Sequence, residues 1–556
     1  MEHSHPATGV PDTIYVNGRI RPGSRAPGLA ARGERRDEED EAYEALAVSR
    51  GRVTALGTDR EIRDLAGPRS EVVDLRGHRV IPGLIDGHMH ATRAGSTWSS
   101  ELHWTGMSAL TDALTSVGEA VRSAPPGRWI RAVGGWHHTQ FKENRPPSTA
   151  ELDAVAPDHP VYVQALYDLA VLNSEAMRVL GLDSWTGLPS GTVERDPLTG
   201  RCTGVVRGLG AFNRCLAAIP GPDAAAERAS TRAMFADLNA VGLTGVVDPG
   251  GFGMAPERYD PLFDLWRAGE LTVRMRLYVS AVDAGHEVSQ LEGWLRHAQT
   301  SFGDDMLRMV GAGEVVHFGC HDFEGLEPFS LMDEAYEDLL TISRRVAERG
   351  WPMHIHAVLD SSIDRILDAW ETVHRQIPLD RLRFSLAHAD TISPRNIRRL
   401  AALGAGVVTD DHQVFKAGAS AACWGAEQMA SVPPLGDLLE AGVQVGAGTD
   451  ATRASSYSPW LSLWWLHEGR SLDGRVQRAP RHNLSRQQSL DLYTRGSAWF
   501  SFEESDRGHL RPGARADLAV LSDDYFTVPA DLIPSITAQL TVVGGRTVHA
   551  SGPFRA

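Results

Sequence analysis

Two histidines one residue apart, His88 and His90, end a short apolar run that reads I-P-G-L-I-D-G-H-M-H over residues 81–90. Alternate side chains of an extended strand point to the same side, so both imidazoles could bind one metal ion. Zinc and similar divalent ions commonly take such nitrogen ligands. Any strand can carry this spacing by chance, so a metal site is indicated only if other parts of the chain supply further ligands.

Four further segments place an imidazole or a carboxylate near the end of an apolar run. They are G-A-G-E-V-V-H-F with Glu314, H-I-H-A-V-L-D with His356, L-A-H-A-D with His388, and G-A-G-T-D with Asp450. Convergence of such groups from separate strands favours a metal centre over a set of unrelated core residues. His354 faces the same side of its strand as His356, so the strand period alone leaves both open as ligands.

Eight apolar runs are predicted to be the strands that position these residues. They cover residues 84–88, 243–249, 273–280, 309–317, 352–358, 383–390, 405–411 and 443–450, and helical patterns lie between them. Eight parallel strands with crossover helices close a (β/α)₈ TIM barrel, whose active site lies at the C-terminal ends of the strands. The candidate ligands all fall at those ends.

Local signals support the helices of this barrel. Ser393 and Pro394 predict a helix N-terminus, and Gly404 ends that helix before the seventh strand. Apolar residues recur from Ile363 to Val373 with helical spacing, which predicts a face that covers the barrel.

Strand-like segments at both chain ends predict a second, smaller domain. They lie at 13–20, 45–56, 71–75, 516–522 and 540–550, too few at either end for a stable sheet alone. We therefore expect residues 1–81 and 508–556 to form one β-sandwich-like domain beside a barrel over 82–507. Residues 21–44 lack periodicity and are interpreted as a mobile surface loop.

The gap between the first two barrel strands is too long for one crossover. It predicts an inserted subdomain over about residues 95–238, with a strand at 161–167.

Composition narrows the function classes. The 556-residue chain has a net charge of −16 and no long basic stripe, which argues against nucleic acid as a partner. The four cysteines are widely spaced, and neither a signal sequence nor a membrane-spanning run is evident, so a cytoplasmic protein is expected. The expected partner is a small molecule, and a homodimer is one expected assembly.

Together these motifs resemble those of the amidohydrolase superfamily, specifically its YtcJ-like branch of metal-dependent hydrolases. The resemblance rests on V-I-P-G-L-I-D-G-H-M-H, W-P-M-H-I-H-A-V-L-D, L-A-H-A-D, A-G-V-Q-V-G-A-G-T-D and L-R-P-G-A-R-A-D-L-A-V-L, which span most of the chain. It implies a hydrolase of carbon–nitrogen bonds other than peptide bonds, with one or two divalent ions, zinc first. The implied metal ligands are His88, His90, His356, His388 and Asp450.

The fourth strand departs from this family. Many relatives carry a carboxylated lysine there, but the only lysines of this chain are Lys142 and Lys416, and neither lies on a predicted barrel strand. Glu314 stands at the equivalent point and could bridge two ions or bind one. His317 should face away from Glu314 and is the weaker candidate.

The ligand set predicts a hydrolytic mechanism. A divalent ion lowers the pKa of bound water to about 7 and polarises a carbonyl. Asp450 would accept the proton of that water and pass it to the leaving amine.

Several residues are expected to contact the substrate, which we expect to have an aromatic or apolar portion. They are Trp104, Trp136, His137, His321 and Trp424. His321 and Glu324 could contact substrate or metal, but the favoured interpretation is that they lie on a solvated loop. The resemblance makes a formamide or another N-acyl amine the first candidate substrate.

Two other functions stay open at this stage. A heterocycle deaminase of the same superfamily would carry a glutamate three residues after His356, where this chain has Leu359. A barrel that binds a ligand without turnover is the other alternative, and metal-free protein would favour it.

Overall fold

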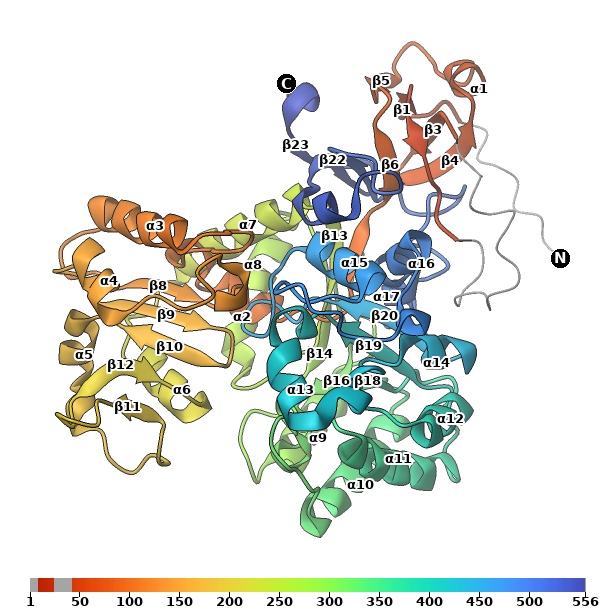
Figure 1. The fold of residues 1–556 in the computed structure, drawn as a ribbon. Coiled ribbons are helices and arrows are strands. Elements are labelled where there is room, and N and C mark those ends of the chain that lie inside the picture. The colour runs from red at the N-terminus through yellow and green to blue at the C-terminus, as the bar shows by residue number, and fades with distance from the viewer. Residues whose placement is uncertain (1–8, 25–42, 556) are drawn as a thin grey trace.

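The computed structural model describes residues 9–24 and 43–555 (Figure 1). Most of the loop expected at 21–44 lies outside these residues. The described chain forms a central barrel, a second unit at the chain ends and a third unit inserted after the first barrel strand. Within this described part, no helix has the length and apolar character that a membrane crossing requires.

Eight parallel strands form the barrel, which confirms the predicted TIM-barrel fold. In spatial order they are β7 (Leu84–Asp86), β13 (Leu243–Asp248), β14 (Arg274–Val279), β16 (Leu307–Glu314), β17 (Met353–Ala357), β18 (Ser385–His388), β19 (Gly406–Asp410) and β20 (Gln444–Gly448). The first and last strands meet through a hydrogen bond from Gly87 N to Ala447 O at 2.8 Å. The barrel is therefore nearly closed, and all C-terminal strand ends share one rim.

Helices surround the barrel and follow most of its strands. They are α7 (Ala224–Ala240), α8 (Asp260–Arg267), α9 (Glu287–His297), α10 (Asp333–Glu348), α11 (Asp360–His374), α12 (Pro394–Ala402), α13 (Gln413–Met429), α14 (Leu435–Glu440) and α15 (Pro459–Glu468). Ser393 caps α12 by accepting from Asn396 N, with Pro394 at its first position, as predicted. The predicted stripe from Ile363 to Val373 is buried against the strands.

Two further sheets lie at the chain ends. One has the order β4 (Arg52–Gly57), β3 (Ala45–Ser49), β1 (Thr13–Val16), β5 (Glu71–Asp74); the other has β2 (Arg19–Ile20), β6 (Arg79–Pro82), β21 (Leu518–Leu521), β22 (Ala538–Val543), β23 (Arg546–Ala550). A single hydrophobic cluster contains residues of both sheets, including Tyr15, Leu46 and Val520. The strand expected over 13–20 is interrupted at Asn17, whose φ of 56° is left-handed, so its halves join different sheets.

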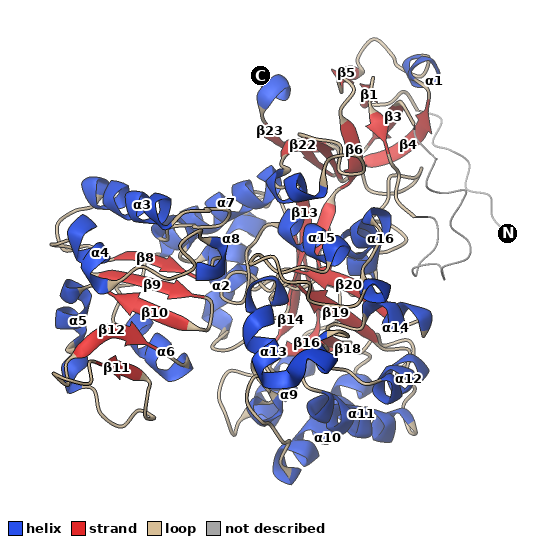
Figure 2. Cartoon of the chain, viewed as in Figure 1, coloured by secondary structure: helices blue, strands red, loops and turns tan. Residues whose placement is uncertain are grey.

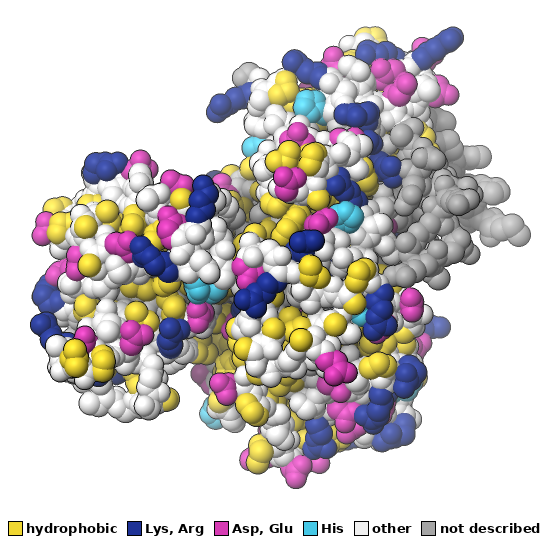
Figure 3. Space-filling model, in the orientation of Figure 1, with side chains coloured by type: hydrophobic (Ala, Val, Ile, Leu, Met, Phe, Trp, Pro, Cys, Tyr) yellow, Lys and Arg dark blue, Asp and Glu magenta, His cyan; other side chains and the backbone are white. Residues whose placement is uncertain are grey.

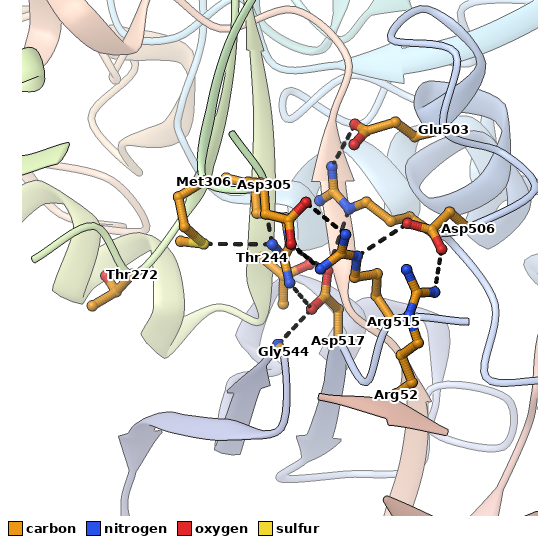
Figure 4. A network of polar contacts seen from close by, with 12 residues as sticks. Arg52, Thr244, Thr272, Asp305, Met306, Glu503, Asp506, Arg515, Asp517 and Gly544 are labelled. Carbon is orange, nitrogen blue, oxygen red and sulfur yellow. Dashed lines mark hydrogen bonds and ion pairs between the residues drawn. The ribbon is translucent and has the colours of Figure 1, made fainter. Parts of the chain in front are cut away.

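Buried ion pairs connect the C-terminal sheet to the N-terminal side of the barrel (Figure 4). Arg274 of β14 donates to both carboxylate oxygens of Asp517 at 2.8 and 2.9 Å. Its neighbour on the same face, Arg276, donates to both oxygens of Glu503 at 2.7 Å. Arg515 joins the network through Asp305 and Asp506, two of the residues labelled in Figure 4. These pairs fix the position of the terminal sheet at the end of the barrel opposite the rim.

The inserted unit contains a five-stranded sheet with helices on both faces (Figure 2). Its strands, in order, are β11 (Val193–Arg195), β12 (Cys202–Val206), β10 (Leu169–Leu172), β9 (Val161–Ala165) and β8 (Ile130–Val133). Its helices are α3 (Leu110–Ser123), α4 (Thr149–Val155), α5 (Ser174–Leu180) and α6 (Leu209–Ala217). Val161 and Val163 face one hydrophobic cluster while Tyr162 faces the other, as strand alternation requires.

Candidate metal centre

A cavity of about 630 Å³ lies over the C-terminal rim of the barrel. The inserted unit contributes Tyr167, from the β9–β10 turn, and Leu209, from the start of α6, to its wall. Phenylalanines and other apolar residues form much of the remaining wall, and Figure 3 shows hydrophobic side chains in the hollow between the inserted unit and the barrel. The cavity therefore combines an apolar wall with a polar floor.

On one side of the floor, the histidines that follow β7 meet two carboxylates. His88 Nε2 lies 2.9 Å from Glu314 Oε2 and 3.6 Å from Asp450 Oδ1. His90 Nε2 lies 3.5 Å from Glu314 Oε2 and 3.1 Å from Asp450 Oδ1. The side chains predicted to converge from the first, fourth and eighth strands therefore meet at one point. They are His88, His90, Glu314 and Asp450.

The other oxygen of Glu314 faces a second group of imidazoles. Glu314 Oε1 lies 3.7 Å from His356 Nδ1 and 3.5 Å from His321 Nε2. His388 Nε2 is 2.8 Å from His356 Nδ1. Glu314 therefore stands between the two groups, with one oxygen directed at each.

Each predicted histidine ligand has its other ring nitrogen held by the protein. His90 Nδ1 lies 2.8 Å from Gly250 O, and His88 Nδ1 lies 2.9 Å from His354 Nε2. His356 Nε2 is 2.7 Å from Phe323 O, and His388 Nδ1 is 2.6 Å from an oxygen of Asp410. A proton on the anchored nitrogen leaves the other nitrogen as a lone-pair donor, which is the usual arrangement of metal-binding histidines.

Strand ends and one buried carboxylate position the first group. Asp86, the last residue of β7, accepts from His88 N at 3.0 Å and from Thr449 Oγ1 at 2.6 Å. Burial raises the pKa of Asp86 to about 7, against the effect of these hydrogen bonds. Asp86 thereby holds the ends of the first and eighth strands together.

The charges at the floor of the cavity are strongly coupled. Burial would raise the pKa of Glu314, but the surrounding imidazoles, His90 first, hold it well below its ordinary value. Burial would lower the pKa of His88, but Asp450 and Glu314 hold it well above its ordinary value. For His356, Asp322 and then Glu314 outweigh burial and raise the pKa to about 10. The carboxylates are thus ionised, and positive charge is favoured between them.

The residues present fit a divalent cation. His88 Nε2 and Glu314 Oε2 are buried, and neither takes part in a hydrogen bond with any described residue. Among the described residues, four sets of donor atoms lie close enough to hold an ion. Two of them include the donors around Glu314: His88, His90 and Asp450 in one, and Glu314, His321 and His356 in the other. A third adjoins them and consists of His388, Asp410, His412 and Asp450, whereas the fourth, His137, His138 and Asp168, lies in the inserted unit. Imidazole nitrogen and carboxylate oxygen are ligands that zinc takes readily. Such a cation would replace the protons that the imidazoles otherwise hold.

His354 and His317 lie outside the set of converging donors. His354 is 2.8 Å from Ser385 Oγ through Nδ1 and contacts His88 through Nε2, so it supports a ligand. His317 lies 3.3 Å from Asp338 on α10 and faces away from Glu314, as the strand period predicts.

His321 corrects an interpretation from the sequence. The loop beyond β16 was expected to be solvated, yet His321 is 6% exposed, stacks on the His356 ring at 3.6 Å and lines the cavity. Burial and the charge of His356 lower its pKa to about 4. Glu324 of this loop forms an ion pair with Lys416 of α13, and both residues line the cavity.

Trp104 and Trp136 are not brought to the cavity, contrary to the expectation that they contact substrate. Both are 0% exposed. Their rings lie 4.6 Å apart in the hydrophobic cluster of the inserted sheet, beside Phe141. Packing within the inserted unit therefore explains both residues.

His137 and Trp424 lie near the cavity without lining it. His137 Nε2 is 3.5 Å from Asp168 Oδ2, at the turn that also carries Tyr167. The indole N–H of Trp424 donates to Gly325 O at 2.8 Å, and Gly325 does line the cavity. Trp424 thus supports the wall from behind.

Some residues of the site were not found from the sequence. Asp410 ends β19 and lies between His388 and His412, each with a contact of 2.6 Å. Asp410 lies near the end of the apolar run at 405–411, the same kind of position that identified the other candidate ligands, so the sequence could have indicated it. Asp322, 3.0 Å from His356 Nε2, and Arg93, which lines the cavity, follow candidate histidines but belong to no pattern that would single them out.

A model of the amidohydrolase family matches residues 71–549 of this chain. Among curated proteins, the N-substituted formamide deformylase of Arthrobacter pascens is 29% identical over 92% of this chain and 95% of its own length. The putative amidohydrolase YtcJ of Bacillus subtilis is 24% identical over 92% of this chain and 97% of its own length.

Solved structures share the fold. An uncharacterized metal-dependent hydrolase from Pyrococcus furiosus superposes with a TM-score of 0.64 at 21% identity, covering 93% of this chain and 100% of the other. A variant of the atrazine chlorohydrolase TrzN from Arthrobacter aurescens, complexed with zinc and atraton, gives a TM-score of 0.53 at 17% identity over 97% and 95%.

Proposed function

Because this chain belongs to the amidohydrolase family and is a hydrolase of carbon–nitrogen bonds, we propose that its substrate is a small N-acyl or N-formyl amine. The observation that carries the proposal is the convergence of imidazole and carboxylate groups from separate barrel strands on the floor of one cavity. The similarity to an N-substituted formamide deformylase supports the N-formyl class.

The proposed metal ligands form two groups around Glu314. His88, His90 and Asp450 would hold one divalent ion, zinc in the first instance, and His356 and His388 would hold a second. Glu314, with one oxygen toward each group, would take the bridging place that many relatives give to a carboxylated lysine. When bound in this centre, a divalent ion would lower the pKa of water to about 7 and polarise a carbonyl oxygen.

Asp450 is the proposed proton-transfer residue. Its pKa lies well below its ordinary value because His88 and His90 outweigh the effect of burial, so the carboxylate is ionised at neutral pH. It lines the cavity and can accept a proton there, then deliver it to the departing nitrogen. Since an amine is a poor leaving group until it is protonated, one reusable carboxylate serves both steps.

The cavity wall favours an apolar portion in the substrate. Phe252 and Phe323 line it with their rings stacked at 5.9 Å, and Phe329 also lines the cavity. An aromatic group attached to the amine nitrogen would bury its surface against these rings.

N-Formyl-2-phenylethylamine is a direct test substrate. We expect hydrolysis to formate and amine, with one or two divalent ions per chain by elemental analysis. His88→Ala should lose metal, and Asp450→Asn should lose at least a hundredfold in kcat, a typical scale for removing an acid–base group. His317→Ala, away from the cavity, is the matched control. Wild-type turnover in both site variants would refute the proposal.

A further inference from the structure

A separate group of metal-binding side chains lies in the inserted unit, outside the candidate centre. It consists of His137, His138 and Asp168, and one donor atom from each lies within 4.8 Å of the other two. These three described residues do not line the cavity. The proposed hydrolysis gives them no role, so their convergence needs an explanation of its own.

The sheet of the inserted unit brings these residues together. β8 and β9 are parallel neighbours, so the chain leaves both strands at the same edge of the sheet (Figure 1). His137 and His138 follow β8 at the start of a short 3₁₀ helix, and Asp168 lies in the turn between β9 and β10. Strand order therefore places the two histidines beside the aspartate.

The distance between His137 and Asp168 suits a shared ion better than a direct hydrogen bond. His137 Nε2 lies 3.5 Å from Asp168 Oδ2, whereas a hydrogen bond between such charged groups spans about 2.7–2.9 Å. Two ligands of one zinc ion, each about 2.0–2.1 Å from it at tetrahedral angles, lie roughly 3.4 Å apart. The observed separation is therefore that of two ligands of the same ion.

Thr139 can hold the other nitrogen of the His137 ring. His137 Nδ1 lies 2.9 Å from Thr139 Oγ1 and 3.4 Å from Thr139 N. Through the shorter contact, Nδ1 can donate its proton to the hydroxyl oxygen, and Nε2 then keeps its lone pair on the side of Asp168. This is the same arrangement as that of the histidines in the candidate centre.

His138 supplies a buried nitrogen without a partner. Its Nδ1 is buried and makes no hydrogen bond with any described residue. Its ring lies 4.0 Å from the His137 ring, so the two imidazoles lie side by side. A buried polar atom that lacks a hydrogen bond destabilises the fold. Beside a second imidazole and a carboxylate, a divalent cation would satisfy it.

Arg207 leaves one oxygen of Asp168 open to a cation. Its guanidinium lies 3.2 Å from Oδ1, the oxygen that does not face His137. The side chains of Arg207 and Asp168 are 46% and 42% exposed, so solvent screens the repulsion between the arginine and a bound ion. Solvent can also supply the water that completes a four-coordinate zinc ion with three protein ligands.

We propose that His137, His138 and Asp168 bind a zinc ion, or a similar divalent cation, at the edge of the inserted sheet and apart from the candidate centre. This site goes beyond the proposed hydrolysis and does not depend on it. A bound ion would join the segment after β8 to the β9–β10 turn, whose Tyr167 lines the cavity. It would thereby fix a part of the inserted unit that borders the cavity.

Zinc content tests the site. The full chain and its variants are dialysed against a buffer of fixed free zinc, and elemental analysis gives the zinc per chain. We expect His138→Ala and Asp168→Asn each to hold about one ion fewer than wild type, because each loses a ligand. His286→Ala removes an exposed histidine at the start of α9 and should keep the wild-type content. Equal zinc content in all four proteins would overturn the proposal.

The His88→Ala background separates this ion from those of the candidate centre. His88→Ala removes a ligand of the centre and leaves the proposed site intact. Adding His138→Ala to it should therefore remove about one further ion. If the single and double variants held the same zinc content, the ion would belong to the centre, and the proposal would fail.

Hydrogen exchange shows where the ion binds, without a need for turnover. Zinc is added to metal-depleted His88→Ala at ten times the dissociation constant of the site. Amide exchange through local opening should then slow about tenfold in residues 137–140 and 166–169. The double variant with His138→Ala should lose this protection. Unchanged exchange in both segments of His88→Ala would contradict the assignment.

Discussion

At the residue scale, the candidate centre depends on histidines that are held at one nitrogen and open at the other. The anchoring groups differ: backbone oxygens for His90 and His356, an imidazole for His88, a carboxylate for His388. Such outer contacts fix which nitrogen carries the proton and how each ring is turned. Loss of an anchor should therefore weaken metal binding without removing a ligand.

Asp410→Asn tests this dependence. The amide keeps the shape but removes the negative charge that lies 2.6 Å from both His388 Nδ1 and His412 Nδ1. We expect metal affinity to fall about 10- to 100-fold, the usual cost of losing such a contact. Competition with a coloured chelator measures the affinity. Asp338→Asn, whose carboxylate contacts His317 outside the cavity, is the control, and equal affinities for the two variants would refute the role given to Asp410.

At the element scale, the barrel positions the centre through the ends of its strands. His388 has a φ of 71° and Asp450 a φ of 51°, left-handed conformations that non-glycine residues rarely adopt. Both residues lie where a strand ends and the chain turns over the rim. Backbone strain of this kind concentrates at functional sites, where the surrounding structure maintains it.

Gly448→Ala tests how closely the first and eighth strands must approach. A Cβ at Gly448 would lie 2.5 Å from His88 N and 2.8 Å from an oxygen of Asp86. One of the strand ends must shift, so we expect a loss of about 1–3 kcal/mol in stability, typical of overpacking, together with weaker metal binding.

Gly210→Ala is the matched substitution, because nothing lies within 4 Å of the added carbon. Urea unfolding and chelator competition on both variants give the comparison. If Gly448→Ala kept the stability and the metal affinity of the wild type, the first and eighth strands would not need to approach this closely.

At the scale of the whole molecule, units from distant parts of the chain complete the catalytic barrel. The inserted unit contributes Tyr167 and Leu209 to the cavity over the rim, and the terminal sheet attaches to the opposite end through Arg274 and Asp517, which are 3% and 4% exposed. Because both members are buried, removing one leaves an uncompensated charge.

Asp517→Asn should destabilise the protein by about 3–5 kcal/mol at neutral pH, since Arg274 and Arg507 would lose the negative charge of this carboxylate. Burial opposes ionisation of Asp517, but Arg274 outweighs it and lowers the pKa to about 2. Because the pKa of Asp517 is lower in the folded state than in the unfolded state, its ionisation stabilises the folded protein at pH values above the unfolded-state pKa, which is near 4. This stabilisation is lost as the pH falls toward 2.

The difference in unfolding free energy between wild type and Asp517→Asn should therefore shrink as the pH falls from about 4 to about 2. Denaturant titrations across this range measure it. Asp264→Asn, which disrupts an exposed pair with Arg267, should leave stability unchanged at every pH. A constant difference across the range would show that the Asp517 carboxylate does not carry the effect.

The amino-acid sequence by itself determined the barrel and the convergence of His88, His90, Glu314, His356 and Asp450. Strand alternation and the common direction of parallel strands are local rules, and they place the ends of the eight apolar runs on one rim. The family resemblance, confirmed by the match over residues 71–549, added the expected role of each residue.

Only the tertiary structure decided the environment of several individual side chains. Trp104 and Trp136 pack in the hydrophobic cluster of the inserted sheet, and His321 turns inward onto His356. The environment of each of these side chains depends on segments far away in the sequence. Contacts of that kind arise from the packing of whole units, so neither residue type nor periodicity reveals them.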